Sequence, residues 1–372
     1  MQFTVLLAYS SLAVLNMLPL YFEHLGGTPR RIGLLVGLFA LASFLSRPLG
    51  GWLLNRIPPK KVLWGGLCLF LAMTPAYLGV RTLAWAMVLV RVLHGLGFSV
   101  FIIAALYIVI LAVREEQSAY ALGVVSTGFM LPLLIAPYIG EQVIIKLGFP
   151  SFFLLATALA FIPFVYVAGS RVTVPWSAKK TQGERLEFLR LLRRKKVLVL
   201  SLLAFVFEVG LSSALSFVPL LALEGPGLRA GYYFTCLGLT AVFFRLYVGK
   251  KMKSWGKPGW LFPAFCLLSL GGLALNFSAN SLMLALSGMV MGMGAGILYP
   301  HLSSLCVAGL EPHEKSLVLS IFASAVDLGF AIGPILFGLL SEVLGVRFTF
   351  IPIFVLVFAS ASILIFLGRK DF

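Results

Sequence analysis

The chain has 372 residues, of which 60% are hydrophobic and only 11% are charged. This composition excludes an ordinary soluble globular protein, in which about a quarter of the residues are charged. The net charge of +16 does not indicate nucleic-acid binding, because most basic residues lie in short segments between apolar runs and no folded basic module remains outside them.

The apolar runs have the length of membrane-spanning helices, which need about 20 mainly apolar residues. The first run has no basic leader and no small-residue cleavage site, so it is expected to be a span and not a signal peptide. Short connections between most runs predict antiparallel neighbours. We therefore expect an all-α polytopic membrane protein with twelve transmembrane helices in two six-helix bundles. The predicted spans are residues 3–22, 32–54, 62–80, 83–112, 119–141, 150–169, 197–221, 230–249, 259–277, 281–307, 317–340 and 348–367.

The connection between spans six and seven is much longer than the others and divides the chain into halves. In it, Leu186, Leu189 and Leu192 recur at helical spacing among basic residues. This pattern predicts a short amphipathic helix on the anionic inner leaflet, tethering the two halves. The expected domains are a six-helix bundle over 1–170, a basic cytoplasmic linker over 171–196 and a second six-helix bundle over 197–372.

The placement of lysine and arginine predicts the orientation, because cytoplasmic loops carry an excess of these residues. With the N-terminus inside, twenty of the 29 lysines and arginines fall in cytoplasmic segments. The sequence therefore predicts a multi-pass protein of the cytoplasmic membrane with both termini in the cytoplasm. The opposite side holds only Arg30, Arg31, Arg81, Lys146, Arg229 and Arg347.

Two arginines stand at equivalent points of the two halves. Arg47 and Arg245 each precede a glycine by four residues, Gly51 and Gly249, near the end of an apolar run that then breaks into a lysine-rich turn. An arginine inside a bilayer costs about 2.5–3.5 kcal/mol even on an insertion scale. Its recurrence predicts a duplicated bundle in which these residues hold spans 2 and 8 in a cytoplasmic gate.

The turn after span two reads G-W-L-L-N-R-I-P-P-K-K from Gly51. It resembles the loop 2–3 signature of the major facilitator superfamily, G-x-L-x-D-R-x-G-R-R. Asn55 stands in place of the usual aspartate, and Pro58 in place of the second glycine. In the family that aspartate helps to latch the cytoplasmic side. The resemblance therefore implies that Gly51, Asn55 and Arg56 belong to a gate whose latch is weaker or differently built.

Three further segments are similar to motifs of the same superfamily. Span four carries R-V-L-H-G-L-G from Arg91, like the family's R-x-x-x-G. Span five carries A-P-Y-I-G from Ala136, a degraded form of the antiporter signature G-P-x-x-G-G, and span eleven carries D-L-G-F-A-I-G-P from Asp327. The resemblance covers essentially the whole chain. It implies alternating access between two halves and places the chain near the drug/proton antiporter-like efflux branch.

Two carboxylates are candidates for proton coupling because they lie deep in predicted spans. At 1.5 Å per residue, Glu208 lies about 16 Å into span seven, near the midplane of a core about 30 Å thick. Burial favours the neutral acid, so Glu208 is expected to handle a proton or substrate, the alternative being a permanently paired structural residue. Asp327 is expected to serve in coupling or to fix the gate through a basic partner. Glu23 and Glu141 are placed at solvated outer span ends, outside the site.

Five residues are expected to line the substrate path, since by the resemblance spans 1, 4, 7 and 10 form the cavity. Arg91 could pair with a carboxylate, bind an anionic group or oppose a proton. His94 could titrate near neutral pH, the alternative being a packing residue. Tyr299 and His301 follow a glycine run in span ten that permits close helix approach. Asn16 is the polar candidate in span one.

The expected function is secondary active transport by alternating access, favouring proton-coupled efflux of small amphipathic organic compounds. The chain lacks a G-x-x-x-x-G-K-[ST] loop, so an ion gradient is the expected energy source, with no cofactor and no metal. The sequence contains no nucleophile–base pair of the kind that would predict an enzyme. The expected partners are a small-molecule substrate, protons and the lipid bilayer, and no nucleic acid is expected. The protein is expected to be a monomer. The alternatives are proton-coupled transport of a small organic anion or a sugar, and a non-transporting membrane sensor.

Overall fold

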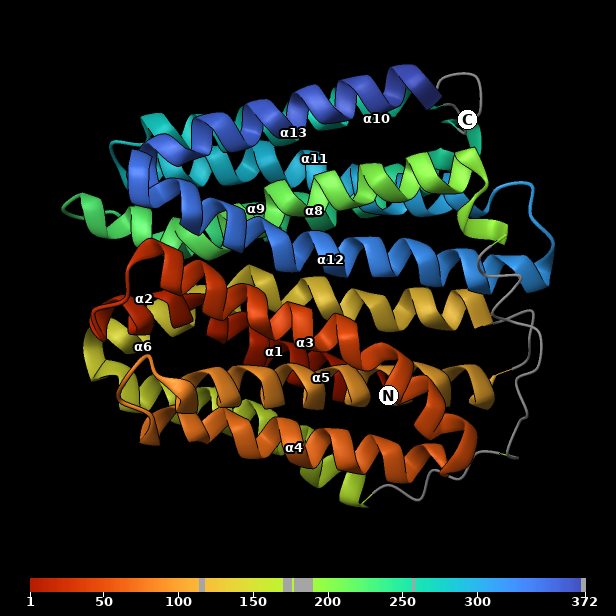
Figure 1. The fold of residues 1–372 in the computed structure, drawn as a ribbon, viewed down its shortest axis with the longest axis horizontal. Coiled ribbons are helices and arrows are strands. Elements are labelled where there is room, and N and C mark those ends of the chain that lie inside the picture. The colour runs from red at the N-terminus through yellow and green to blue at the C-terminus, as the bar shows by residue number, and fades with distance from the viewer. Residues whose placement is uncertain (114–117, 170–175, 177–189, 256–257, 369–372) are drawn as a thin grey trace. The chain divides into compact units, whose positions relative to one another are not determined.

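The structure, a computed structural model, describes residues 1–113, 118–169, 176, 190–255 and 258–368 (Figure 1). This described part is predominantly helical and contains no strand. The chain divides into two compact units, Met1–Lys180 (unit 1) and Thr181–Phe372 (unit 2). Most of the predicted linker, including Leu186 and Leu189 of the expected amphipathic helix, lies outside the described residues, so the linker boundaries stay a prediction.

Unit 1 contains the first six predicted spans. The segments α1, η1 and α2 together form span one, whereas α6 contains both span five and span six. The two are separated at Gly148, which has a positive φ of 79°. Glycine adopts this conformation without steric cost because it has no Cβ. Span five therefore extends beyond its predicted end at residue 141. The elements are α1 (Gln2–Val14), η1 (Leu15–Met17), α2 (Leu18–His24), α3 (Pro29–Arg56), α4 (Pro59–Gly79), α5 (Trp85–Ala112) and α6 (Ser118–Gly169).

Unit 2 contains the other six spans, and all twelve predicted spans lie on helices. By length and composition, nine helical segments of the described chain could cross a membrane, and Leu261–Phe277 is a shorter apolar helix. The elements are α8 (Lys195–Leu221), η3 (Ala222–Glu224), α9 (Ala230–Trp255), η4 (Pro258–Trp260), α10 (Leu261–Ala274), η5 (Leu275–Phe277), α11 (Ser281–Val307), α12 (Pro312–Leu344) and α13 (Val346–Gly368).

Local capping explains where several helices begin. The Thr28 hydroxyl accepts a hydrogen bond from the Arg31 amide at the start of α3, where Pro29 occupies the first position. The Asn280 side chain does the same for the Met283 amide at the start of α11. These contacts satisfy backbone N–H groups that a helix leaves without partners in its first turn. The residues Thr28 and Asn280 therefore determine where α3 and α11 begin.

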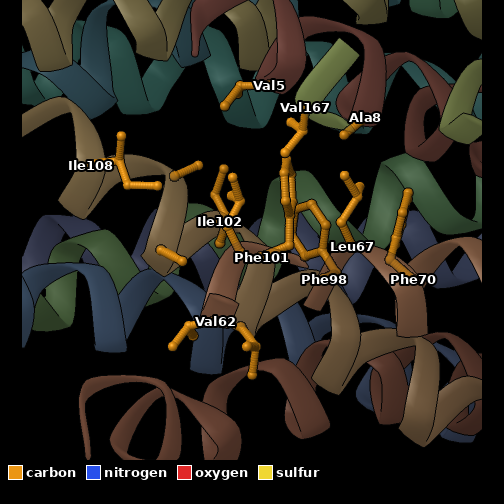
Figure 2. Packing of buried hydrophobic residues seen from close by; sticks show 14 of the residues in the cluster. Val5, Ala8, Val62, Leu67, Phe70, Phe98, Phe101, Ile102, Ile108 and Val167 are labelled. Carbon is orange, nitrogen blue, oxygen red and sulfur yellow. The ribbon is translucent and has the colours of Figure 1, made fainter. Parts of the chain in front are cut away.

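The core of unit 1 lies where α1, α4, α5 and α6 meet, and Figure 2 shows Phe98, Phe101 and Leu67 packed at its centre. Lipid is as apolar as these side chains, so close packing and not exclusion from water holds such helices together. Gly66 and Gly97 permit that packing. A Cβ on Gly97 would lie 2.7 Å from the Phe70 amide nitrogen, and one on Gly66 would overlap the Phe101 backbone.

Unit 2 is built around α8, which packs against α11, α12 and α13 and is buried along most of its length. Figure 1 shows α8 and α12 running side by side. The predicted close approach at the glycine run of α11 is present. Gly296 faces the Ala241 carbonyl of α9 and Gly294 the Ala264 carbonyl of α10, each so close that a Cβ would lie 2.5–2.6 Å from the oxygen. Small residues thus let α11 touch two helices at once.

Candidate functional site

Unit 1 holds a buried polar group of four side chains, which we call the Arg91 cluster: Thr74, Tyr77, Arg91 and His94. Thr74 and Tyr77 are three residues apart on α4, and Arg91 and His94 are three residues apart on α5. Residues at this spacing share one face of a helix, so each helix turns its pair toward the other. Thr74, Tyr77 and His94 are fully buried, and Arg91 is 6% exposed.

The guanidinium of Arg91 is held by backbone and side-chain acceptors. Its Nε donates to the Leu35 carbonyl at 2.8 Å and its Nη2 to the Val36 carbonyl at 3.0 Å, both on α3. Its Nη1 donates to the Tyr77 hydroxyl at 3.3 Å, and its Cζ lies 4.8 Å from the centre of the Phe39 ring. Groups of α3 and α4 therefore bind the charged guanidinium of Arg91 within unit 1.

The remaining members of the cluster continue the hydrogen bonding on α4 and α5. The Tyr77 hydroxyl lies 3.1 Å from Nδ1 of His94, and Nε2 of His94 lies 3.5 Å from Oγ1 of Thr74. The Thr74 hydroxyl donates to the Phe70 carbonyl at 2.9 Å. The ring of His94 is also packed between Phe39 and Phe70, with ring centres 5.3 and 4.8 Å apart. The described contacts of His94 are therefore those of a residue packed inside unit 1, not of a residue at a solvated binding surface.

The glycines beside Arg91 and His94 explain the local sequence. A Cβ on Gly95 would overlap the Phe39 carbonyl of α3, and Gly97 approaches α4 in the same way. Within one segment of α5, Gly95 therefore packs against α3 and Gly97 against α4, while Arg91 and His94 each contact both helices. This geometry favours a positioning role for Arg91 and His94 over the substrate contact expected from the sequence.

Unit 2 holds two carboxyl groups in its interior, which we call the carboxyl pair: Glu208 on α8 and Asp327 on α12. Glu208 is only 8% exposed and makes no hydrogen bond with any described residue, whereas Asp327 is half-buried. The two lie close enough for their charges to interact. The sequence predicted a deep position for each residue independently, and the structure brings them together.

Small residues allow this close approach of α8 and α12. A Cβ on Gly329 would lie 2.5 Å from the Phe205 carbonyl oxygen and 2.9 Å from Cβ of Glu208. The Ser212 hydroxyl donates to the Gly329 carbonyl at 3.3 Å. Gly333, one turn further along α12, faces the Val209 carbonyl. Gly329 thus lets this part of α12 pack directly against the part of α8 that carries Glu208.

A second set of predicted residues also comes together in unit 2. The guanidinium carbon of Arg245, on α9, lies 5.1 Å from the centre of the Tyr299 ring on α11. The Tyr299 ring contacts Phe322 of α12 edge-on, with centres 5.6 Å apart. Arg245 was expected in a gate and Tyr299 in the substrate path, and their mutual contact was not anticipated. His301 is buried on the same helix, 1% exposed.

The other predicted positions are distributed over unit 1 and the end of α9. Asn16 lies in the η1 segment and is partly exposed, while Gly249 lies in α9 among residues whose side chains are not described. The gating roles of this group, including any latch toward span eleven, stay predictions. At the end of α3, Arg47, Gly51 and Asn55 are partly exposed, and the exposed Arg56 stacks over the Trp52 ring at 4.5 Å.

Several polar contacts were not expected from the sequence. Arg194 and Glu314 join the starts of α8 and α12 through two hydrogen bonds of 3.2 and 2.6 Å. Arg347 donates to Glu224 at 3.1 Å. The placement of Glu141 at a solvated span end is wrong, because this residue is 5% exposed within α6. Among the described residues, no group of three histidine, cysteine, aspartate or glutamate side chains could hold a metal ion.

The comparison with protein families identifies the chain. The sequence model of the Major Facilitator Superfamily matches residues 1–307 and 257–371. The chain belongs to the major facilitator superfamily. As a member of this superfamily it is a multi-pass membrane transporter and not an enzyme, as expected from its spans and motifs.

Relatives within the superfamily include export proteins. The chain is 24% identical over 360 residues to the staphylopine export protein of Staphylococcus aureus strain Mu50, covering 93% of this chain and 89% of that protein. It is 25% identical over 350 residues to the multidrug resistance protein MdtG of Salmonella choleraesuis strain SC-B67, covering 91% and 86% of the two chains.

Solved structures confirm the fold. A bacterial homolog to the human lysosomal transporter Spinster, in its inward-facing and occupied conformation, superimposes with a TM-score of 0.85 at 14% identity. The alignment covers 100% of this chain and 96% of that one. The nucleoside transporter NupG superimposes with a TM-score of 0.77, also at 14% identity, over 99% of this chain and 97% of its own. The twelve-helix, two-bundle architecture predicted from the sequence is therefore the fold of the superfamily.

Proposed function

We propose that the protein exports small amphipathic organic compounds in exchange for protons, by alternating access between its two units. The observation that carries this proposal is the carboxyl pair. Glu208 is buried in the middle of a membrane helix, lies near a second carboxyl group and has no hydrogen-bond donor among the described residues. Such a group is expensive to keep charged inside a membrane and is most often functional.

The electrostatics of the pair support proton coupling. Two carboxylates that lie close together repel each other, so the pair is most stable when it holds one proton. Release of that proton places a second negative charge beside the first in a medium of low dielectric constant. A conformational change that admits water to Glu208 would lower this cost. We therefore assign Glu208 as the residue that gains and loses the proton, with Asp327 setting the strength of the proton's binding.

The direction and the substrate class are supported by the relatives and by the Arg91 cluster. Both relatives described above have names that denote export or drug resistance. In the alternative in which the protein carries organic anions, Arg91, His94 and His301 would bind the substrate. The structure gives that alternative less support, because the donors of Arg91 are engaged by the Leu35 and Val36 carbonyls and by Tyr77.

We further propose that the protein lies in the cytoplasmic membrane with both termini inside. This orientation places the start of α4, with Lys60 and Lys61, and the end of α9, with Lys253, on the cytoplasmic side. It agrees with the excess of positive charge in cytoplasmic loops. In that orientation the Arg194–Glu314 contact also lies on the cytoplasmic side. Labelling of single cysteines placed in these loops from either side of the membrane would test it.

The coupling role is tested with the purified protein in proteoliposomes. The probe is an organic cation, such as ethidium, whose binding has first been shown by a rise in melting temperature. Glu208→Gln should reduce uptake driven by a pH gradient to background, while exchange of labelled for unlabelled probe without a gradient persists. The matched control is Glu23→Gln, which removes an exposed carboxylate at the end of α2 and should transport like the wild type. Normal gradient-driven uptake by Glu208→Gln would show that Glu208 is structural.

A further inference from the structure

The contacts of the Arg91 cluster fit an arrangement in which all its hydrogen bonds run in one direction. An arginine side chain can donate but not accept hydrogen bonds, so the Tyr77 oxygen accepts from Nη1 of Arg91. The hydroxyl hydrogen of Tyr77 is then free to point elsewhere. Its described side-chain partner is Nδ1 of His94, at 3.1 Å. In this arrangement Tyr77 donates to His94, and Nδ1 of His94 carries no hydrogen.

The same arrangement assigns the hydrogen at the other end of the histidine ring. A neutral imidazole with an unprotonated Nδ1 carries its hydrogen on Nε2. That nitrogen faces the Thr74 hydroxyl oxygen at 3.5 Å, and the Thr74 hydroxyl donates in turn to the Phe70 carbonyl at 2.9 Å. The hydrogen bonds therefore run in one direction, from Arg91 through Tyr77, His94 and Thr74 to a backbone carbonyl of α4. Each donor and acceptor in the series is used once.

A second proton on His94 would break this series. Nδ1 would become a donor directed at the Tyr77 oxygen, and the hydroxyl hydrogen of Tyr77 would lose its acceptor. The new positive charge would also lie within the same buried cluster as the guanidinium of Arg91, without a carboxylate among the cluster's members to offset it. The groups that face the ring are Tyr77 and Thr74 on α4, Phe39 on α3 and Phe70 on α4. None of them compensates a positive charge by ionisation.

We propose that Tyr77 and His94 are positioning residues, which hold Arg91 on the Leu35 and Val36 carbonyls so that α3, α4 and α5 move as one block during transport. In this arrangement His94 keeps a single neutral tautomer, with hydrogen on Nε2, and carries no proton between the two sides of the membrane. The inference does not depend on Glu208 being the coupling residue. It would hold equally for a transporter driven by another ion.

The tautomer of His94 is tested directly by NMR of the full-length protein labelled with ¹⁵N-histidine, in lipid nanodiscs at pH 6 and pH 8. His94→Gln identifies the resonances by their loss. We expect the His94 Nδ1 signal to be that of an unprotonated nitrogen and the Nε2 signal that of a protonated one at both pH values. A doubly protonated ring at pH 6, or hydrogen on Nδ1 at either pH, would overturn the proposal.

Variants test whether the series positions Arg91 during transport. Tyr77→Phe removes the central hydroxyl and should lower the maximal rate of probe transport about three- to tenfold, because two buried partners lose their hydrogen bond. It should leave the probe's half-saturating concentration within about twofold and convert the His94 signals into a mixture of tautomers. Tyr107→Phe, on α5 but outside the cluster, is the matched control and should change neither.

A conservative pair and a pH profile complete the test. Thr74→Ser keeps the hydroxyl and should transport within about twofold of the wild type, whereas Thr74→Val keeps the shape and should lose rate as Tyr77→Phe does. His94→Gln should retain the wild-type dependence of rate on pH, even where the rate itself falls. Loss of that pH dependence in His94→Gln, or equal rates for Thr74→Ser and Thr74→Val together with an unchanged Tyr77→Phe, would overturn the positioning role.

Discussion

The two units each bury polar side chains inside a membrane fold, but in opposite ways. In unit 1, Arg91, Tyr77, His94 and Thr74 satisfy one another and three backbone carbonyls. In unit 2, Glu208 is equally enclosed yet has no hydrogen-bond donor among the described residues and lies near another carboxyl group. A buried polar group with every partner in place stabilises one structure. A buried group without partners is stable only while neutral, so its charge can respond to conformation.

The largest difference between the two units is expected when a methyl group is added at one helix-contact glycine in each unit. Gly95→Ala and Gly329→Ala should each destabilise the protein by about 3 kcal/mol, because the new methyl group meets a backbone carbonyl of a neighbouring helix that cannot move aside. Only Gly329→Ala should also shift the pH dependence of transport, since Cβ of Glu208 lies against that position. Unfolding in mixed micelles gives the free energies.

The matched control for both glycine variants is Gly65→Ala on α4. An added Cβ there meets nothing within 4 Å, and alanine favours a helix over glycine by up to about 1 kcal/mol. This variant should be as stable as the wild type or slightly more stable. An identical pH shift in Gly95→Ala and Gly329→Ala would remove the distinction between the two centres.

A smaller effect is expected from changing the shape of the cation in unit 1. Arg91→Lys keeps the charge, but a single ammonium group cannot reach two carbonyls of α3 and the Tyr77 hydroxyl together. The free energy of unfolding should fall by about 2 kcal/mol, the loss of one or two charge-assisted hydrogen bonds. If Arg91→Lys instead kept full stability and lost only affinity for the probe, Arg91 would be a substrate-binding residue.

The smallest effect on stability is expected at the Arg194–Glu314 ion pair, which is partly exposed to water. It serves as a reference for the effects of the glycine variants and of Arg91→Lys. The Arg194 and Glu314 side chains are 37% and 13% exposed. Because water screens the pair, Arg194→Gln should cost only about 0.5 kcal/mol. Glu314→Gln can still serve the capping box at the start of α12, so a double-mutant cycle isolates the ion pair. A coupling energy as large as the effect of Arg91→Lys would show that burial does not separate these groups.

The sequence was sufficient to predict the fold because the length of an apolar run is a strong constraint in a membrane. It also located Glu208 and Asp327 at depth, since a charged residue within such a run is conspicuous. Their proximity required knowing that Gly329 lets α12 approach α8, which the spacing of residues alone does not show.

The Arg91 cluster was only half predicted. Arg91 and His94 stand out in an apolar run, whereas Thr74 and Tyr77 look like ordinary membrane residues. The available signal was that both pairs are three residues apart, on helices joined by a short connection and therefore antiparallel neighbours. Glu141 was misplaced because the position of a residue along a helix does not tell whether its side faces the protein interior or the surroundings.

The central claim is that the carboxyl pair holds one proton near neutral pH, and infrared difference spectroscopy of the protein in lipid tests it without a substrate. The spectrum at pH 7 should contain the C=O band of a protonated carboxyl group, which disappears at higher pH. Glu208→Gln should remove this band, whereas Glu23→Gln should leave it unchanged. Absence of the band from the wild type at pH 7, or its persistence at full intensity in Glu208→Gln, would contradict the account.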